Sequence, residues 1–381
     1  MHKKGLIIFI MGFGLLFQTV HAQTWSKTKR LTWNSSNSDR PSIETDTSNN
    51  IYILWTEYIS SNSEIFFKKS TNGGTSWTSK RLTWNSGFSI SPVVSTDSKN
   101  RIHVVWEDSS SGTYEIHYKK STDGGTSWTS KQLTSGSIGC GSMSPAVDID
   151  TNDNICVTWY SDKSGNMEIY FRRSTNAGNT WSNKRLTWNA GESRTPAIAT
   201  DSNNNIYVVW YDDTPGNADI FLKKSTDGGT TWSDKRLTWN SDSSSNPSVE
   251  ADSNNFIHVV WHNYTSSNYE VYYKKSTNGG GTWTAAKRLT WNLGNSKWPK
   301  VTTDSNDNIH VVWEDETPGT SEVFFKRSTN GGVSWTMKRL TWNSGSSQFP
   351  KVNCDSMNRI HVTWGDYTPG NREIFYKKGQ Q

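Results

Sequence analysis

Short apolar runs separated by turn-forming residues recur along the whole chain. In the first such stretch the runs lie at 42–45, 51–56, 64–69 and 80–84, and Asp46-Thr47-Ser48-Asn49-Asn50 separates the first two. Apolar runs of this length, bounded by Asn, Asp, Ser and Gly, predict short strands joined by tight turns. No long run of helical periodicity occurs in the sequence. We therefore expect an all-β protein.

The four-strand stretch is itself repeated, with a period of about fifty residues. Its second strand ends in Trp, and the seven copies end at Trp55, Trp106, Trp159, Trp210, Trp261, Trp313 and Trp364. Such units predict a seven-bladed β-propeller, with an open solenoid as the alternative. The expected blades are about 41–85, 92–136, 145–189, 196–240, 247–292, 299–343 and 350–378. The last unit lacks its fourth strand, and residues 24–34 match it, so we expect the N-terminus to complete the last blade and close the ring.

A proline precedes the first strand of every unit, at Pro41, Pro92, Pro145, Pro196, Pro247, Pro299 and Pro350. Proline has no backbone N–H for a sheet ladder. We therefore expect each of these prolines to stand before its strand, and none to fall inside one.

The first residues have the pattern of a secretory signal peptide. Lys3 and Lys4 precede an apolar run that ends at Val20, and Val20-His21-Ala22 resembles a cleavage site. We expect a signal peptide at 1–22 and a secreted mature chain at 23–381, with an uncleaved anchor as the alternative. The apolar run is too short to predict a membrane span, and no later run approaches one.

Composition and charge narrow the classes of partner. A net charge of +5, spread evenly over 381 residues, gives no reason to expect nucleic acid as a partner. The cysteines are Cys140, Cys156 and Cys354, and an odd number argues against a disulfide framework, although a pair between Cys140 and Cys156 stays open. No metal-ligand spacing is present, so we expect no metal and no other cofactor.

One turn in the repeat carries a recognisable motif. Ser121-Thr122-Asp123-Gly124-Gly125-Thr126-Ser127-Trp128 has close copies beginning at Ser70, Ser174, Ser225, Ser276 and Ser328. These turns resemble the Asp-box (BNR) repeats of the sialidase superfamily. The resemblance implies a propeller in which this turn joins the third and fourth strands, on the face opposite the active site. We expect this turn to be structural, because its Asp or Asn caps the turn and its Trp packs against the blade.

Polar and aromatic residues that recur on the other face are the candidate ligand-binding groups. They are Trp84, Asn85, Asp108, Trp188, Asn189, Asp212, Trp239, Asn240, Asp315 and Asp366. Aromatic walls beside Asn and Asp suit sugars, and sevenfold repetition would raise avidity. Packing of the Trp rings between blades is the alternative. The carboxylates that open the third strand, such as Glu64, are instead expected to pair with the Arg that opens the fourth, such as Arg81.

The resemblance also raises the possibility of a sialidase-type enzyme. Arg194-Thr195-Pro196 matches the Arg-x-Pro motif of that family, Asp108 and Asp212 are candidate acids, and Tyr211 is a candidate nucleophile. However, every candidate acid has equivalents in other blades, whereas catalysis requires differentiated groups. We therefore expect a non-catalytic recognition module whose partners are glycans or glycoconjugates. An exo-acting glycosidase and an extracellular protein-interaction scaffold are the alternatives.

Three other features are expected to be structural. His103, His258, His310 and His361 recur at one strand position and are predicted to pack between blades rather than bind metal. The Asp-rich turns between the first two strands are predicted to be Asx turns rather than calcium loops. At the end of one unit, Gln132 and Ser135 replace the usual Arg and Trp, which indicates either a functional break or drift in one copy.

Overall fold

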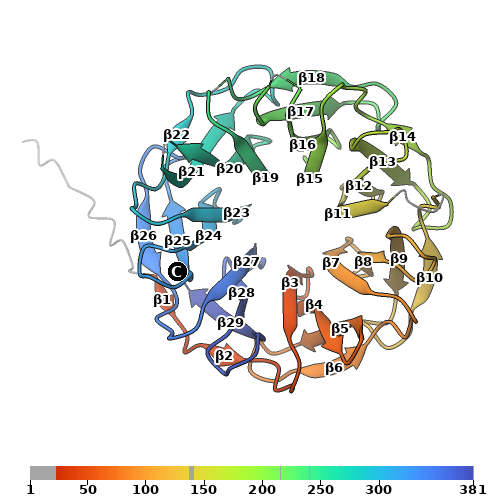
Figure 1. Cartoon of the computed structure of the whole chain (residues 1–381), viewed down its shortest axis with the longest axis vertical. Coiled ribbons are helices and arrows are strands. Elements are labelled where there is room, and N and C mark those ends of the chain that lie inside the picture. The colour runs from red at the N-terminus through yellow and green to blue at the C-terminus, as the bar shows by residue number, and fades with distance from the viewer. Residues whose placement is uncertain (1–22, 137–140, 215, 240, 266, 381) are drawn as a thin grey trace, which may run out of the picture.

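The computed structural model describes residues 23–136, 141–214, 216–239, 241–265 and 267–380. Seven antiparallel sheets stand around a central channel, and each sheet is one blade (Figure 1). The strands of each blade follow one another from the channel to the outer edge. Within the described ranges, no helix has the length and apolar character needed to cross a membrane. The predicted all-β, seven-bladed propeller is confirmed.

Each position in a blade is filled by one strand from every repeat. The innermost strands are β3 (Ser38–Thr45), β7 (Ser89–Thr96), β11 (Ser142–Ile149), β15 (Ser193–Thr200), β19 (Ser244–Ala251), β23 (Ser296–Thr303) and β27 (Ser347–Cys354). The second strands are β4 (Ile51–Ile59), β8 (Ile102–Asp108), β12 (Ile155–Ser161), β16 (Ile206–Asp212), β20 (Ile257–Thr265), β24 (Ile309–Asp315) and β28 (Ile360–Asp366). The third strands are β5 (Asn62–Ser70), β9 (Glu115–Ser121), β13 (Glu168–Ser174), β17 (Asp219–Ser225), β21 (Asn268–Ser276), β25 (Glu322–Ser328) and β29 (Glu373–Gln380). The outermost strands are β6 (Thr78–Arg81), β10 (Thr129–Gln132), β14 (Lys184–Arg185), β18 (Ser233–Arg236), β22 (Lys287–Arg288) and β26 (Thr336–Arg339).

The N-terminal residues supply the outer edge of the last blade. Strands β1 (Thr24–Trp25) and β2 (Lys29–Arg30) both pair with β29, in the register Thr24 to Gln380 and Lys29 to Tyr376. Leu31 then inserts into the core beside Ile374. The ring is therefore closed by the two ends of the chain, as predicted.

The expectation that no proline lies within a strand is wrong. Each innermost strand begins three residues before its proline, and its pairing with the second strand shifts register at that point, for example between Asp39 and Ser42 in β3. The shift is a β-bulge, which takes the proline out of the hydrogen-bonded ladder. The missing N–H therefore costs no ladder hydrogen bond.

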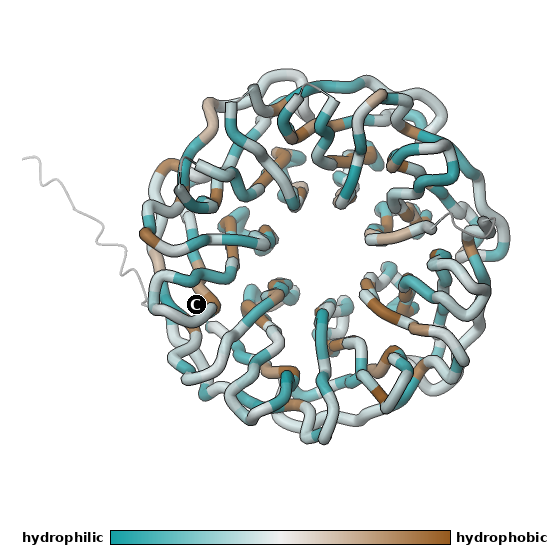
Figure 2. The backbone as a smooth tube through the Cα atoms, in the orientation of Figure 1, coloured by the Kyte–Doolittle hydropathy of each residue, from teal (hydrophilic) through white to brown (hydrophobic). Residues whose placement is uncertain are grey.

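The apolar core lies between neighbouring blades. Leu54 and Phe67 of the first blade pack against Val104 and Trp106 of the second, and all four are buried. The ring of Trp128, in the turn before β10, meets Phe67 edge-on at 5.6 Å between centroids. Figure 2 shows the hydrophobic segments set within the ring of blades. Burial of each large apolar side chain contributes roughly 1.5–3 kcal/mol, so stability comes from the seven repeated interfaces.

The motif turns close onto themselves in the way that the resemblance implies. In the turn at 121–128, the Ser121 hydroxyl accepts a hydrogen bond from the Gly125 N–H at 2.8 Å, and the Trp128 indole donates to the Gly125 carbonyl at 3.0 Å. Hydrogen bonds from Ser127 lower the pKa of Asp123. Both glycines of the turn have positive φ. The Ser, Asp and Trp side chains of the motif are thus all used within the turn.

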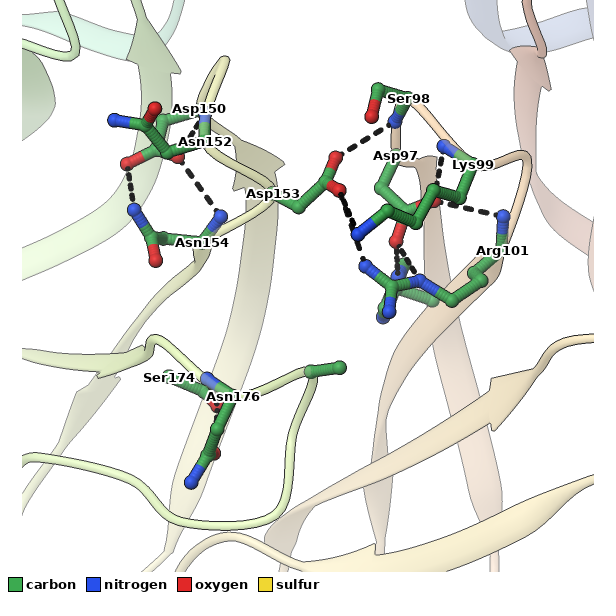
Figure 3. Close-up of polar contacts among 12 residues, drawn as sticks. Asp97, Ser98, Lys99, Arg101, Asp150, Asn152, Asp153, Asn154, Ser174 and Asn176 are labelled. Atoms are coloured by element: carbon green, nitrogen blue, oxygen red, sulfur yellow. Dashed lines mark hydrogen bonds and ion pairs between the residues drawn. The ribbon is translucent and has the colours of Figure 1, made fainter.

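The turns between the first and second strands link the blades on the same face as the motif turns. Asp97 caps its own turn by accepting the Lys99 and Arg101 N–H groups, as an Asx turn does. In the next turn the Asp153 carboxylate accepts the Ser98 N–H at 3.0 Å (Figure 3). Equivalent contacts join every pair of neighbours, including Ser356 to Asn49 at 2.8 Å between the last blade and the first. These hydrogen bonds form a second closed ring.

The recurrent histidines stand at a strand position that packs between blades, and they also hydrogen-bond to these turns. His103 is buried, with its Nε2 at 3.0 Å from the Asp97 carboxylate and its Nδ1 at 2.8 Å from the Tyr118 hydroxyl. Burial lowers the pKa of His103. Among the described residues, no group of three or more His, Cys, Asp or Glu side chains is placed to hold a metal ion. Cys140 lies outside the described residues, so its proposed pairing with Cys156 stays a prediction.

Candidate functional site

The residue before each innermost-strand proline has a left-handed backbone. Its φ lies between 47° and 56° in all seven blades, at Arg40, Ser91, Ser144, Thr195, Asn246, Trp298 and Phe349. For residues other than glycine this conformation costs about 1–2 kcal/mol each. The bulge aims all seven toward one end of the channel, which we call the channel mouth. The backbone repeats there, but the side chains change from charged to polar to aromatic.

The strained backbone at the mouth is held by side chains from the preceding blade. The N–H of Ser144 donates to Glu107 at 3.0 Å, that of Trp298 to His262 Nδ1 at 3.2 Å, and that of Phe349 to Glu314 at 3.2 Å. The Ser91 N–H donates to Thr56 Oγ1 at 3.1 Å in the same way. One structural task is therefore performed by a carboxyl, an imidazole or a hydroxyl. This freedom lets the mouth vary without loss of the fold.

One side of the mouth, from the first three blades, is polar. We call Arg40, Glu107, Tyr114 and Tyr160 the polar arc, and all four line the channel. The Arg40 guanidinium donates to Ser91 Oγ at 2.7 Å. Burial raises the pKa of Glu107, and the nearby Arg40 partly offsets this rise. Burial and the Glu107 carboxyl raise the pKa of Tyr160.

The opposite side, from the last three blades, is aromatic. We call His262, Trp298, Phe349 and Tyr367 the aromatic arc. The Trp298 ring lies 5.9 Å from His262 and 5.8 Å from Phe349, in edge-on contacts. The Arg372 guanidinium continues the arc, at 5.3 Å from the Phe349 ring centre and 4.5 Å from that of Tyr367.

A glycine makes room for this arginine. A Cβ on Gly365 would lie 2.9 Å from Cδ of Arg372, whereas the other six blades carry a side chain at this strand position. Because Gly365 of the last blade has no side chain to accept the Arg40 N–H, this N–H donates instead to the neighbouring Asp39 carboxylate, at 2.7 Å. Arg372 forms an ion pair with Asp39 and donates to Gln348 at 2.8 Å. The substitution of glycine thus places a cation at the mouth.

The mouth opens into a channel of about 950 Å³. Lys300 and Lys351 line its middle, and Glu44, Asp148 and Glu250 lie nearer its far end. Burial raises the pKa of Glu44 to about 8 and lowers that of Lys300 to about 8. The channel below the mouth therefore carries charged side chains among apolar ones.

The predicted carboxylates and amides are brought together, but within the blades. Asp108 is buried and accepts hydrogen bonds from the Trp106 indole at 3.0 Å, from Ser89 at 2.9 Å and from Asn85. Asp212, Asp315 and Asp366 are buried in the same way, and Asn189 donates to Asp212. Asn240 lies outside the described residues. The described acids and amides thus hydrogen-bond the end of the second strand to the loop that leads into the innermost strand of the same blade.

The other predicted residues lie elsewhere. Trp84, Trp188 and Trp239 are exposed at the outer part of the same face, each beside the Arg of its own outermost strand. Arg194 forms an ion pair with Glu192 and pairs in register with Tyr211, one residue before the bulge. The third-strand carboxylates pair with the fourth-strand arginines as predicted, for example Glu64 with Arg81 at 2.8 Å.

Most residues of the two arcs were missed because attention to the repeat favours positions that are alike. The usable signal was the opposite one. At the position before each proline, and at the position after each second-strand Trp, the residue type changes from blade to blade. These positions face the centre of the ring because a bulge in each innermost strand turns them inward. The sequence does not reveal this bulge.

Solved structures with a similar fold act on carbohydrates. Polysaccharide lyase Uly1 superposes with a TM-score of 0.61 at 10% identity, covering 91% of this chain and 90% of that one. The fold is that of the sialidase-like β-propellers. The GH93 α-L-arabinofuranosidase of Fusarium graminearum, solved with arabinobiose, gives a TM-score of 0.58 at 13% identity over 80% of this chain and 93% of the enzyme. A protein of unknown function from Dyadobacter fermentans gives 0.59 at 14% identity, over 95% and 100% of the two chains. No protein-family model and no curated protein matches the sequence.

Proposed function

We propose that this protein is a carbohydrate-recognition propeller that binds a glycan at the channel mouth and does not cleave it. The observation that carries the proposal is the asymmetry of the mouth. The blades are near copies, yet at this one place they present a polar arc facing an aromatic arc. The similar folds of carbohydrate-active proteins support a carbohydrate as the ligand.

The two arcs match the two kinds of surface that a sugar presents. Its C–H face stacks on aromatic rings, which Trp298 and Phe349 supply, and its hydroxyls need directed polar partners. Arg40, Tyr114 and Tyr160 provide such partners across the mouth. Arg40 and Arg372, which lie on adjacent blades, suit a glycan that carries an acidic group.

The placement of the carboxyls favours binding over cleavage. Glycoside hydrolysis by two carboxyls needs them about 5–10 Å apart across one bond. Glu107 and Glu314 come from the second and sixth blades, which are as far apart as a seven-membered ring allows. Each also accepts a backbone N–H of the neighbouring blade. Both carboxyls therefore already serve the fold.

A glycan array probed with residues 23–381 tests this proposal. We expect binding to a defined set of glycans, and at least a tenfold loss in Trp298→Ala. Met357→Ala is the matched control, because Met357 is an exposed residue in a turn on the far face. Binding to no glycan, or equal binding by Trp298→Ala and the wild type, would refute the proposal.

A sialidase-type glycosidase is the second candidate. It is favoured by one observation, the closeness of Tyr160, Glu107 and Arg40 in the polar arc, because a tyrosine beside a carboxyl is the nucleophile arrangement that the resemblance implies. Turnover of a fluorogenic sialoside that disappears in Tyr160→Phe would replace the binding proposal with this one. Turnover that disappears only in Arg194→Ala would instead place the reaction at the predicted Arg-x-Pro site.

We also propose that the protein is secreted. Lys3, Lys4 and the apolar run to Val20 support an N-terminal signal peptide. Mass spectrometry of the protein in culture medium should find a mature N-terminus at Gln23. An intact N-terminus in the membrane fraction would contradict secretion.

A further inference from the structure

Six tryptophans stand out on the face that carries the channel mouth, at its outer part. They are 62–67% exposed, and they are Trp33, Trp84, Trp188, Trp239, Trp291 and Trp342. Each follows a buried Leu-Thr pair at the end of an outermost strand. Within the described part of the chain, none of their indole N–H groups has an acceptor in the protein. Packing within the fold therefore does not explain why an indole recurs here.

Cations flank these rings at the junctions between blades. Around Trp84, the Arg81 guanidinium of the same blade lies 5.6 Å from the ring centre, and the Lys119 ammonium of the next blade lies 5.8 Å away. Three more rings have the same pair at 5.4–6.0 Å: Trp239 with Arg236 and Lys274, Trp291 with Arg288 and Lys326, and Trp342 with Arg339 and Lys377. We call these four arrangements the rim sites.

The lysine is the cation that the protein leaves uncompensated at a rim site. Arg81 is paired with the buried Glu64 at 2.8 Å, and the other three rim arginines have equivalent carboxylates. The rim lysines donate to a leucine carbonyl of the preceding blade, as Lys377 does to Leu340 at 2.9 Å. No carboxylate of the described residues lies within ion-pair distance of Lys119, Lys274, Lys326 or Lys377. Each rim site thus combines an open indole with one net positive charge.

The second blade shows that the fold does not need this arrangement. Ser135 replaces the Trp and Gln132 the Arg, while Leu133 and Thr134 remain buried as in the other blades. The strand and its core contact are kept although the indole and guanidinium are both absent. The blade therefore forms without either residue.

We infer that the rim sites bind an acidic polysaccharide, with one sugar of the chain at each occupied site. The C–H face of a sugar stacks on the indole, and its carboxylate or sulfate is attracted by the positive charge of the lysine beside the ring. At two sites this lysine, Lys274 or Lys377, is itself buried. Successive sites around the rim give avidity to a long chain even when each site is weak. The inference extends the proposed carbohydrate function by naming a ligand class, and it concerns a surface separate from the mouth.

Affinity electrophoresis or chromatography on polygalacturonate, with neutral dextran as the comparison polymer, tests the inference. We expect the wild type to be retained on polygalacturonate at least tenfold more strongly than on dextran, and retention to fall between 50 and 300 mM salt. The triple variant Trp84→Ala, Trp239→Ala, Trp291→Ala should lose at least tenfold in affinity. The double variant Gln132→Arg, Ser135→Trp, which adds the missing pair to the second blade, should bind more tightly than the wild type.

Trp298→Ala separates this inference from the proposed function. Retention on polygalacturonate that survives Trp298→Ala and is lost in the triple variant supports the rim sites, whether or not the mouth binds a glycan. Retention that is lost in Trp298→Ala and unchanged in the triple variant overturns the inference, and leaves the mouth as the binding site. Equal retention on dextran and polygalacturonate also overturns it.

Discussion

The second-strand tryptophans offer a test of what the predicted site aspartates do. Asp315 is buried and accepts hydrogen bonds from the Trp313 indole at 3.0 Å, from Ser296 at 2.9 Å, from the Thr317 N–H at 2.9 Å and from Asn292. Five blades have a carboxylate here. In the other two, Ser161 and Asn263 replace it, and the Trp159 and Trp261 indole N–H groups have no partner.

Asp315→Asn should therefore destabilise the protein without affecting glycan binding. The amide keeps the volume, but its NH₂ must face either the Thr317 N–H or the three donors of Trp313, Ser296 and Asn292. Each buried donor left unpaired costs about 1–3 kcal/mol, and the remaining bonds lose their charged acceptor. We expect a loss of about 3 kcal/mol. At roughly 2.1 cal/mol/K of unfolding entropy per residue, this lowers the Tm by about 4 °C. The reverse change, Asn263→Asp, supplies an acceptor to Trp261 and should stabilise by about 1 kcal/mol.

Urea unfolding followed by tryptophan fluorescence measures both changes in the free energy of unfolding, and the glycan array measures binding. A stable Asp315→Asn variant that no longer binds glycan would refute this reasoning, because Asp315 would then be a ligand-binding residue, as one interpretation of the sequence allowed. A destabilised Asn263→Asp variant would refute the idea that the Trp261 indole N–H lacks an acceptor that a carboxylate at position 263 supplies.

Three further predictions follow from the same contacts. Burial raises the pKa of Glu314 to about 7, so the stabilisation that its protonated form gives is complete below its unfolded pKa near 4.5 and is lost as the pH rises through 7. This loss of unfolding free energy is worth up to about 3 kcal/mol. Glu314→Gln should remove it, as measured by urea titrations at pH 5 and 8. Leu31→Ala should cost about 2–4 kcal/mol, as much as Leu237→Ala at the equivalent position of the fourth blade, and a cost below 1 kcal/mol would mean that the N-terminus does not close the ring. Gly365→Ala should displace Arg372 and weaken glycan binding severalfold on the array, with little change in Tm, whereas unchanged binding would remove Arg372 from the site.

The architecture was predictable because the same four-strand pattern occurs seven times in the sequence. Repeated strand signals, the Trp that ends each second strand and the matching N-terminal segment together require a closed ring of blades. The pairing of Glu64 with Arg81 was also predictable, since both stand at fixed places on neighbouring strands. Because several copies of the repeat carry the same signal, a deviation in one copy does not change these inferences.

The candidate site could not be predicted in the same way. Pro41 was interpreted as the start of a strand, whereas Arg40 before it has a left-handed backbone in a bulge and faces the channel. Whether Asp108 faces solvent or the Trp106 indole is decided by side-chain packing, which periodicity does not report. Residues such as Trp298 and Gly365 differ from their equivalents in other blades, so a search for the repeated pattern passes over them.

The most direct test of the central claim is the crystal structure of residues 23–381 with the oligosaccharide that binds most tightly on the array. We predict that the sugar occupies the channel mouth, with a ring stacked on Trp298 or Phe349 and hydroxyls bonded to Arg40 or Tyr160. A sugar bound on the face of the motif turns, with the mouth empty, would contradict the account.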